Sequence, residues 1–343
     1  MADYLTHADP CIALNRQPSL LLELGRLRGA EPALLLREAG IHAADLLDPQ
    51  RQISPQQYLQ LLDRLLRHGK HPELPFLLGQ NLLPGHYGAV SHALLQAADA
   101  GQALQLLLQY QSLLCPLLTP HLHLGPRQAV LYWTPAYACG SLLPALVEMH
   151  MAAVTAMCRW LGEAHLPWRY SFNRTRPRHI EQHQVHLGQQ LHFNAPLDAL
   201  LIERDALTQP WPRGNRTAVE MMLPLIATQE GAAVARRSLL ALLYDWLQQA
   251  MRTPPTLEAA ASQLRVSPAT LKRHLAREGT HFQAELDQAR AHVSLYLLHE
   301  RHYSNEAIAT HLGYHDANNF RRAFKRWTGQ TPGLLRSDLD AAG

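Results

Sequence analysis

The feature that most constrains the fold of this chain lies close to its C-terminus. Ser304 can cap a helix, an apolar stripe follows it, and Gly313 supplies a residue that can end the helix in the left-handed conformation. Beyond the turn, Phe320, Phe324 and Trp327 recur at helical spacing. The pattern predicts two short helices joined by a tight turn, with the second helix buried along its aromatic side.

The opposite side of that second helix is polar and basic. Its outward positions hold Asn318, Arg321, Arg322 and Lys325. A basic helix that follows a tight turn has the shape and charge to enter the major groove of DNA. The segment therefore predicts a helix-turn-helix unit.

The same pattern occurs a second time, upstream. An apolar stripe precedes Ser267-Pro268, which is a cap followed by a first-turn proline, and Leu271 and Leu275 bury the next helix. The outward positions of this helix are Thr270, Lys272, Arg273 and Arg277. Between the two units, residues 282–299 form a helical run of roughly 27 Å, enough to set two recognition helices about one DNA turn apart.

Residues 252–336 resemble the DNA-binding domain of the AraC/XylS family of bacterial transcription regulators. The positions that carry the resemblance are Ile308-Ala309, Leu312-Gly313-Tyr314, Asn319-Phe320, Phe324-Lys325, Gly329, Thr331-Pro332 and Arg336. The first unit departs from the family pattern at Arg265, where a glycine is usual, and at Ala269, where a large polar residue often sits. The resemblance implies a transcription regulator, by analogy an activator that engages RNA polymerase.

The family's mode of docking implies a role for each outward residue. Arg273, Asn318 and Arg322 are expected at base edges, followed by Lys272 and Arg321. Lys325 and Arg277, nearer the helix ends, are expected at phosphates.

Charge divides the chain into two parts. Residues 252–336 hold twelve Lys and Arg against seven Asp and Glu, whereas residues 1–251 hold nineteen of each. Because phosphate attraction supplies most non-specific DNA affinity, the basic part is the expected DNA-binding domain. We predict two domains, 1–251 and 252–343, that meet at the helix-breaking pair Pro254-Pro255.

The first 251 residues predict an α+β domain within a chain that is mainly α. The C-terminal domain is expected to be all α, with its two helix-turn-helix units joined by the long helix. Helical patterns cover 32–39, 55–67, 89–98, 103–114, 141–160 and 232–251, and short strands are predicted at 121–124, 129–133, 168–172, 190–193 and 199–203. The last of these helices could pair with a second chain, which would make it a dimer contact, or cover its own domain.

Scattered positions of this region resemble the effector-binding domain of one AraC branch, which includes regulators of ornithine use, virulence and quorum sensing. They lie in Leu35–Ile41, Asp48-Pro49, Tyr58-Leu59, Gly88–Tyr110 and Phe193–Pro196, with Leu207 and Pro210. The resemblance implies binding of a small-molecule effector and homodimerisation, and it leaves the ligand open.

Five aromatic residues are candidates to line an effector cavity, the alternative being that they are ordinary core. They are Tyr110, Tyr132, Trp133, Trp168 and Phe172. The histidines His179, His183 and His186 have helical spacing, but no Cys, Asp or Glu completes a metal site, so neither a metal nor a cofactor is expected.

Other classes of protein find little support in the sequence. The four cysteines show no CxxC spacing, the N-terminus lacks a signal-peptide pattern, and no membrane span is expected, which favours a cytoplasmic protein with reduced thiols. Nucleophile elbow, P-loop and GxGxxG motifs are absent, so an enzyme is not expected. An architectural DNA-binding protein without small-molecule input stays open as the alternative to an effector-controlled regulator.

Overall fold

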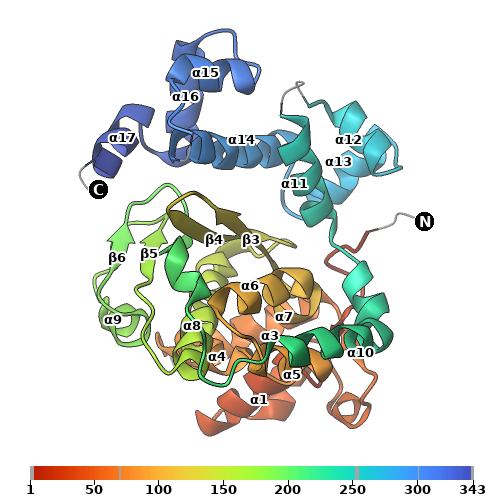
Figure 1. Ribbon diagram of the computed structural model, residues 1–343. Coiled ribbons are helices and arrows are strands. Elements are labelled where there is room, and N and C mark those ends of the chain that lie inside the picture. The colour runs from red at the N-terminus through yellow and green to blue at the C-terminus, as the bar shows by residue number, and fades with distance from the viewer. Residues whose placement is uncertain (1–3, 69–70, 252–254, 300, 341–343) are drawn as a thin grey trace. The chain divides into compact units, whose positions relative to one another are not determined.

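The computed structural model describes the chain except for residues 1–3, 69–70, 252–254, 300 and 341–343, and it divides into two compact units (Figure 1). The N-terminal unit is Leu5–Arg237. The C-terminal unit is Ser238–Gly343, joined by Tyr4 from the other end of the chain. The expected fold class is confirmed: the chain is mainly helical, with a sheet in the N-terminal unit and helices alone in the C-terminal unit.

The N-terminal unit contains most of the described elements. Its helices are α1 (Gln17–Leu27), α2 (Pro32–Glu38), α3 (Pro55–Arg67), α4 (Leu74–Leu82), α5 (Ala89–Leu95), α6 (Ala100–Gln109), α7 (Gln111–Leu114), α8 (Leu143–Gly162), α9 (Glu181–Leu187) and α10 (Arg216–Ala235). Short 3-10 turns are η1 (Ala43–Leu47), η2 (Gly140–Leu142) and η3 (Arg204–Thr208). Its strands are β1 (Ile12–Ala13), β2 (Gln52–Ile53), β3 (Leu118–Leu124), β4 (Gln128–Pro135), β5 (Arg169–Phe172), β6 (Leu191–Phe193) and β7 (Ala199–Glu203).

Five of these strands form one sheet in the order β3-β4-β7-β5-β6, while β1 and β2 pair separately. The pairs are antiparallel except β5 with β6, which run parallel. Figure 1 shows the sheet along one side of the N-terminal unit and helices α1, α3, α4 and α5 on the other. The strands predicted at 121–124 and 129–133 are confirmed as β3 and β4, an antiparallel pair in which His121 lies opposite Tyr132.

Helix α8 joins the helices to the sheet. On one side it packs against α4 so closely that a Cβ at Gly79 would lie 2.1 Å from the carbonyl oxygen of Met149, so only glycine fits there. On the other side, the hydroxyls of Thr155 and Tyr170 are 2.7 Å apart. The stretch Gly140–Gly162 is long and apolar enough to cross a membrane, but its buried residues make it the central core helix of this unit.

One predicted helix needs correction, and several helices were not predicted. The helix predicted over 232–251 is two helices, because α10 ends at Ala235 and a new helix, α11 (Leu239–Ala250), begins after the cap Ser238, whose hydroxyl accepts from the amide of Ala241 at 3.2 Å. Helices α1, α4 and most of α10 were not predicted at all. In α4 and α10 the apolar residues are too evenly distributed around the helix to give a clear amphipathic pattern.

The C-terminal unit is wholly helical. It contains α11, α12 (Leu257–Gln263), α13 (Pro268–Arg277), α14 (Phe282–His299), α15 (Asn305–His311), α16 (Ala317–Thr328) and α17 (Pro332–Asp340). Helix α14 has the predicted bounds and is buried on most sides, as a central helix must be.

The boundary between the two compact units lies before α11. The predicted boundary at 252 lies after α11. The hydroxyl of Tyr244 in α11 is 2.6 Å from Nδ1 of His292 in α14, and α11 clusters with the C-terminal helices. Residues Arg252–Pro254, which include half of the predicted proline joint, lie outside the described residues.

Candidate DNA-binding surface

Two helix-turn-helix units, α12-α13 and α15-α16, lie on either side of α14 in the sequence (Figure 1). Each of the four helices has its N-terminus capped by a side chain. In the second helix of each unit, Ser267 accepts from the amide of Thr270 at 3.1 Å, and Asp316 accepts from the amide of Asn319 at 2.7 Å. Such caps satisfy amides that the helix itself leaves unpaired.

The turns of the two units have the same backbone geometry. Gly313 has φ of 74° and Arg265 has φ of 55°, so both occupy the left-handed region. The following amides close equivalent bonds, Tyr314 to the carbonyl of Ala309 at 2.8 Å and Val266 to that of Ala261 at 2.9 Å. Arg265 therefore adopts the glycine conformation of its counterpart, at a cost of about 1 kcal/mol for a residue with a Cβ.

Buried side chains fix which side of each recognition helix faces outward. In α13, Leu271 and Leu275 are fully buried, and in α16, Phe320 and Phe324 are fully buried. Trp327 is half-buried, with its ring centroid 6.1 Å from that of Tyr314.

The predicted DNA-binding residues occupy the other side of these helices. Lys272, Arg273, Arg277, Asn318, Arg321, Arg322 and Lys325 are exposed, and Thr270 is half-buried beside its cap Ser267. Arg321 donates to the side-chain oxygen of Asn318, so these two act as a pair. The other cations of this set make no ion pair with any residue that the structure describes, which leaves them available to phosphates and bases.

Several side-chain contacts that the sequence did not indicate brace the second unit. Arg326 on α16 pairs with Asp287 at 3.4 Å, and the guanidinium of Arg290 lies 5.3 Å from the ring centre of Tyr314. Arg336 donates to the carbonyl of Tyr303 at 2.6 Å, which explains that signature arginine as structural. These contacts fix α16 and the turn before it to α14, and they fix α17 to the segment before α15, without using the predicted DNA-binding side chains.

Comparison with protein-family models gives two matches that together span most of the chain. Residues 29–211 match the arabinose-binding domain of AraC transcription regulators, N-terminal part, and residues 260–338 match a helix-turn-helix domain. The chain belongs to the AraC family. It is a DNA-binding transcription regulator of this family, with an N-terminal region that matches the family's ligand-binding domain, and its relatives are regulators rather than enzymes.

Two curated relatives match different lengths of the chain. The chain is 30% identical over 325 residues to the ornithine utilization regulator of Pseudomonas aeruginosa, covering 92% of this chain and 94% of that protein. The regulator VqsM of the same organism is 38% identical over 85 residues, 25% of this chain and 26% of that one. Among solved structures, the regulator CdpR of Pseudomonas aeruginosa matches at 21% identity and a TM-score of 0.47, covering 94% of this chain and 98% of that one.

In the N-terminal unit of this AraC-family chain, the five candidate effector aromatics do not lie on one surface. Adjacent strand residues point to opposite faces of a sheet, so Tyr132 and Trp133 on β4 face opposite ways. Tyr132 stacks on His121 with centroids 4.9 Å apart, whereas Trp133 lies 6.2 Å from His150 of α8. Tyr110, Trp133, Trp168 and Phe172 are all buried, as core residues are. The five cannot all line one cavity.

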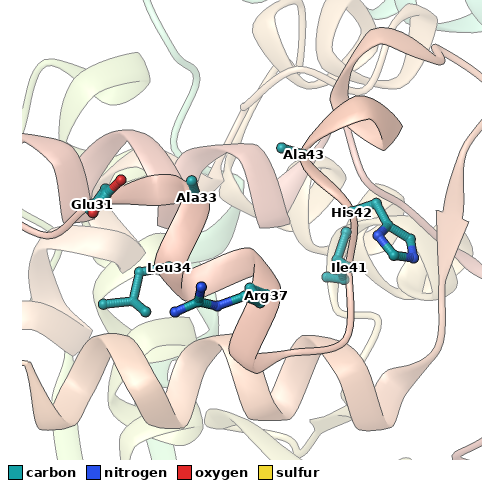
Figure 2. Close-up of a pocket in the computed structure, with 7 residues that line it drawn as sticks. All are labelled: Glu31, Ala33, Leu34, Arg37, Ile41, His42 and Ala43. Carbon is teal, nitrogen blue, oxygen red and sulfur yellow. The ribbon is translucent and has the colours of Figure 1, made fainter.

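Figure 2 shows a pocket elsewhere in this unit, on the surface between α2 and η1. It is about 320 Å³ and is lined by Glu31, Ala33, Leu34, Arg37, Ile41, His42 and Ala43. None of the five aromatic residues contributes to it.

The three histidines of helical spacing do not share a helix face. His179 precedes α9 and its side chain is 78% exposed, whereas His183 is buried against Glu148. His186 is bonded through Nδ1 to Gln80 at 2.9 Å. No cluster of metal-ligand type is found among the residues that the structure describes.

Proposed function

We propose that this chain is a cytoplasmic, one-component transcription activator. A small-molecule effector binds the N-terminal domain, the two helix-turn-helix units bind a promoter, and the bound protein engages RNA polymerase. The effector acts by favouring the conformation or assembly that fits the promoter, which requires a different affinity for the two states.

The observation that carries the proposal is the pair of exposed basic recognition helices in one unit. Helix α14 has 18 residues, roughly 27 Å at 1.5 Å per residue, which suits two helices that read neighbouring major grooves of one DNA face. Within these helices we assign Arg273, Asn318 and Arg322 to base edges. Arg277 and Lys325 are assigned to phosphates.

We further propose that the regulator is a homodimer that pairs through α10. This helix is held to its own unit by the ion pairs Arg216–Asp99 and Arg16–Glu230, and it buries Val219 and Ile226. Its opposite side is uncharged, with Met221 71% and Leu225 43% exposed beside the exposed Thr217 and Thr228. Because a two-fold interface sets each patch against itself, an uncharged stripe suits a second copy of the chain.

The experiment is to map the binding site on the DNA upstream of the chain's own gene, and then to screen metabolites for a change in affinity. Amino compounds belong in the first panel, since one relative is named for ornithine utilization. Sequence-specific binding that a metabolite shifts supports the effector-controlled regulator. Specific binding that no metabolite changes supports the architectural alternative.

A further inference from the structure

The pocket between α2 and η1 combines an apolar wall with ionic groups (Figure 2). Its apolar residues are Ala33 and Leu34 of α2, Ile41 of the turn and Ala43 of η1. Leu34 is 37% exposed, whereas Ile41 is buried in the hydrophobic core. The volume of about 320 Å³ lies at the lower end of the roughly 300 to 1,000 Å³ that is typical of small-molecule sites. The pocket therefore suits a small, partly apolar ligand.

Hydrogen bonds hold the turn between α2 and η1 in one conformation. Gly40 has φ of 68°, in the left-handed region that glycine favours, and the amide of Ile41 donates to the carbonyl of Leu36 at 2.9 Å, which closes the end of α2. The side-chain amide of Gln57 on α3 donates to the carbonyl of Gly40 at 3.0 Å. A ligand in the pocket therefore meets a wall that is already ordered, and binding does not have to supply the free energy of ordering it.

The cation of the pocket is not paired with the carboxylates around it. Two neighbouring carboxylates have cations of their own, since Glu38 pairs with Arg64 at 3.4 Å and Asp45 pairs with Arg51 at 3.2 Å. Arg37 is exposed and makes no ion pair with any residue that the structure describes. Its guanidinium is therefore available to an anion that enters the pocket.

The position of Arg37 indicates the kind of anion. Arg37 and Leu34 are three residues apart on α2, so they are neighbours on one helix face, and both side chains line the pocket (Figure 2). A guanidinium presents parallel N–H donors that match the two oxygens of a carboxylate. The rest of a molecule held in this way lies against Leu34 and Ile41, where burying hydrocarbon is favourable. A carboxylate joined to an apolar body meets both requirements.

Glu31 limits the total charge of the ligand. It lines the same pocket at the start of α2, roughly 9 Å from Arg37 along the helix axis at 1.5 Å per residue. Like Arg37, it makes no ion pair within the part of the chain that the structure describes. A dicarboxylate would leave its second charge without a cation and close to Glu31, which repels it. The pocket therefore favours a monoanion.

We propose that this pocket is the effector site, and that the effector is a small monocarboxylate with an apolar body. Arg37 binds the carboxylate, Leu34 and Ile41 contact the apolar body, and Glu31 disfavours dianions. The inference rests on the proposed effector control and names the site and the ligand class.

The test is a ligand-observed NMR titration of the full-length chain with 4-methylpentanoate. The neutral amide 4-methylpentanamide has the same shape, and adipate is a dianion with the same number of carbon atoms. We expect the monocarboxylate to bind more tightly than either. Arg37→Gln should weaken its binding about tenfold or more, the loss expected for charge-assisted hydrogen bonds, and should leave the amide unaffected. Leu34→Ser should weaken both acid and amide, because it removes part of the apolar wall. Glu31→Gln should narrow the difference in affinity between 4-methylpentanoate and adipate.

Arg178→Gln is the matched control, since Arg178 is an exposed arginine of the same unit that lies outside the pocket. This variant should bind 4-methylpentanoate as the wild type does. Equal binding of acid and amide, unchanged affinity in Arg37→Gln, or no binding of the acid up to millimolar concentration would overturn the site. Binding that requires Arg37 but leaves DNA affinity unchanged would overturn its assignment to the effector. A neutral metabolite that shifts DNA affinity equally in wild type and Arg37→Gln would overturn the site and leave the proposed function intact.

Discussion

Removing α11 should unfold the DNA-binding domain. A fragment that starts at residue 252 lacks α11, whereas a fragment that starts at Ser238 keeps it. In the full chain Leu239, Leu243 and Leu247 of α11 are 1%, 0% and 0% exposed. The boundary predicted from charge, at residue 252, therefore implies that the shorter fragment folds alone. The boundary in packing, at Ser238, implies that it does not.

The burial of these leucines sets the size of the effect. Fully burying one leucine contributes about 1.5 to 3 kcal/mol, so three contribute about 5 to 9 kcal/mol as an upper estimate. The whole stability of a small domain is about 5 to 15 kcal/mol. The loss is thus comparable to the total, and the fragment 252–343 should be largely unfolded while 238–343 folds.

Circular dichroism during urea and thermal denaturation of the two fragments measures this difference. Within the longer fragment, Leu243→Ala should lower the free energy of unfolding by about 2 to 5 kcal/mol. Gln249→Ala, at an exposed position of the same helix, should leave it nearly unchanged. Cooperative melting of 252–343 at the same temperature as 238–343 would refute the assignment of α11 to the DNA-binding unit.

Three further predictions concern DNA contact, self-association and pH. Arg322→Ala should weaken specific DNA binding by about 1 to 3 kcal/mol and relax the sequence preference at one base pair without changing the melting temperature. Arg326→Ala is the control and should keep the sequence preference, because Arg326 forms an ion pair within the domain. Fluorescence anisotropy with operator variants measures both effects, and an unaltered sequence preference in Arg322→Ala would reject the base contact. Met221→Glu should shift the sedimentation profile toward the monomer. Val185 is equally exposed on another helix, so Val185→Glu is the control and should not shift the profile. Identical profiles for the two variants would show that α10 is not in the dimer interface. Burial lowers the pKa of His150 to about 4, below its usual value of 6.5. The unfolded chain therefore binds the proton at higher pH than the folded chain does, and the free energy of unfolding should fall as the pH drops from about 6.5 to 4. In His150→Gln the midpoint of urea denaturation should depend less on pH over that window, and an equally steep decline in the variant would contradict the assignment.

The C-terminal domain was predictable because its signals are local. A cap, a turn residue and a buried aromatic stripe each act within a few residues of Ser304, Gly313 and Phe320, and the structure confirms all three roles. Arg265 shows the same logic, since it stands where the family usually has a glycine and adopts a left-handed conformation that the residue itself does not favour.

The cluster around Glu148 was not predictable from one sequence. Glu148, Arg174 and His183 come from separate parts of the chain and meet only when α8 packs against the sheet and α9, so no sequence spacing indicates their contact. The break at Ser238 was missed for a different reason. The apolar periodicity continues across Ser238, so the sequence indicates one continuous helix and does not reveal that Ser238 is the N-cap of α11.

The most direct test of the account is a hydroxyl-radical footprint of the full-length chain on its own upstream DNA, with Arg273→Ala and Arg322→Ala beside the wild type. Two recognition helices in one chain should protect two segments about one helical turn apart, and each substitution should weaken protection of a different segment. A single protected segment that both substitutions leave intact, or binding equal to that on random DNA, would contradict the claim that α13 and α16 read the promoter together.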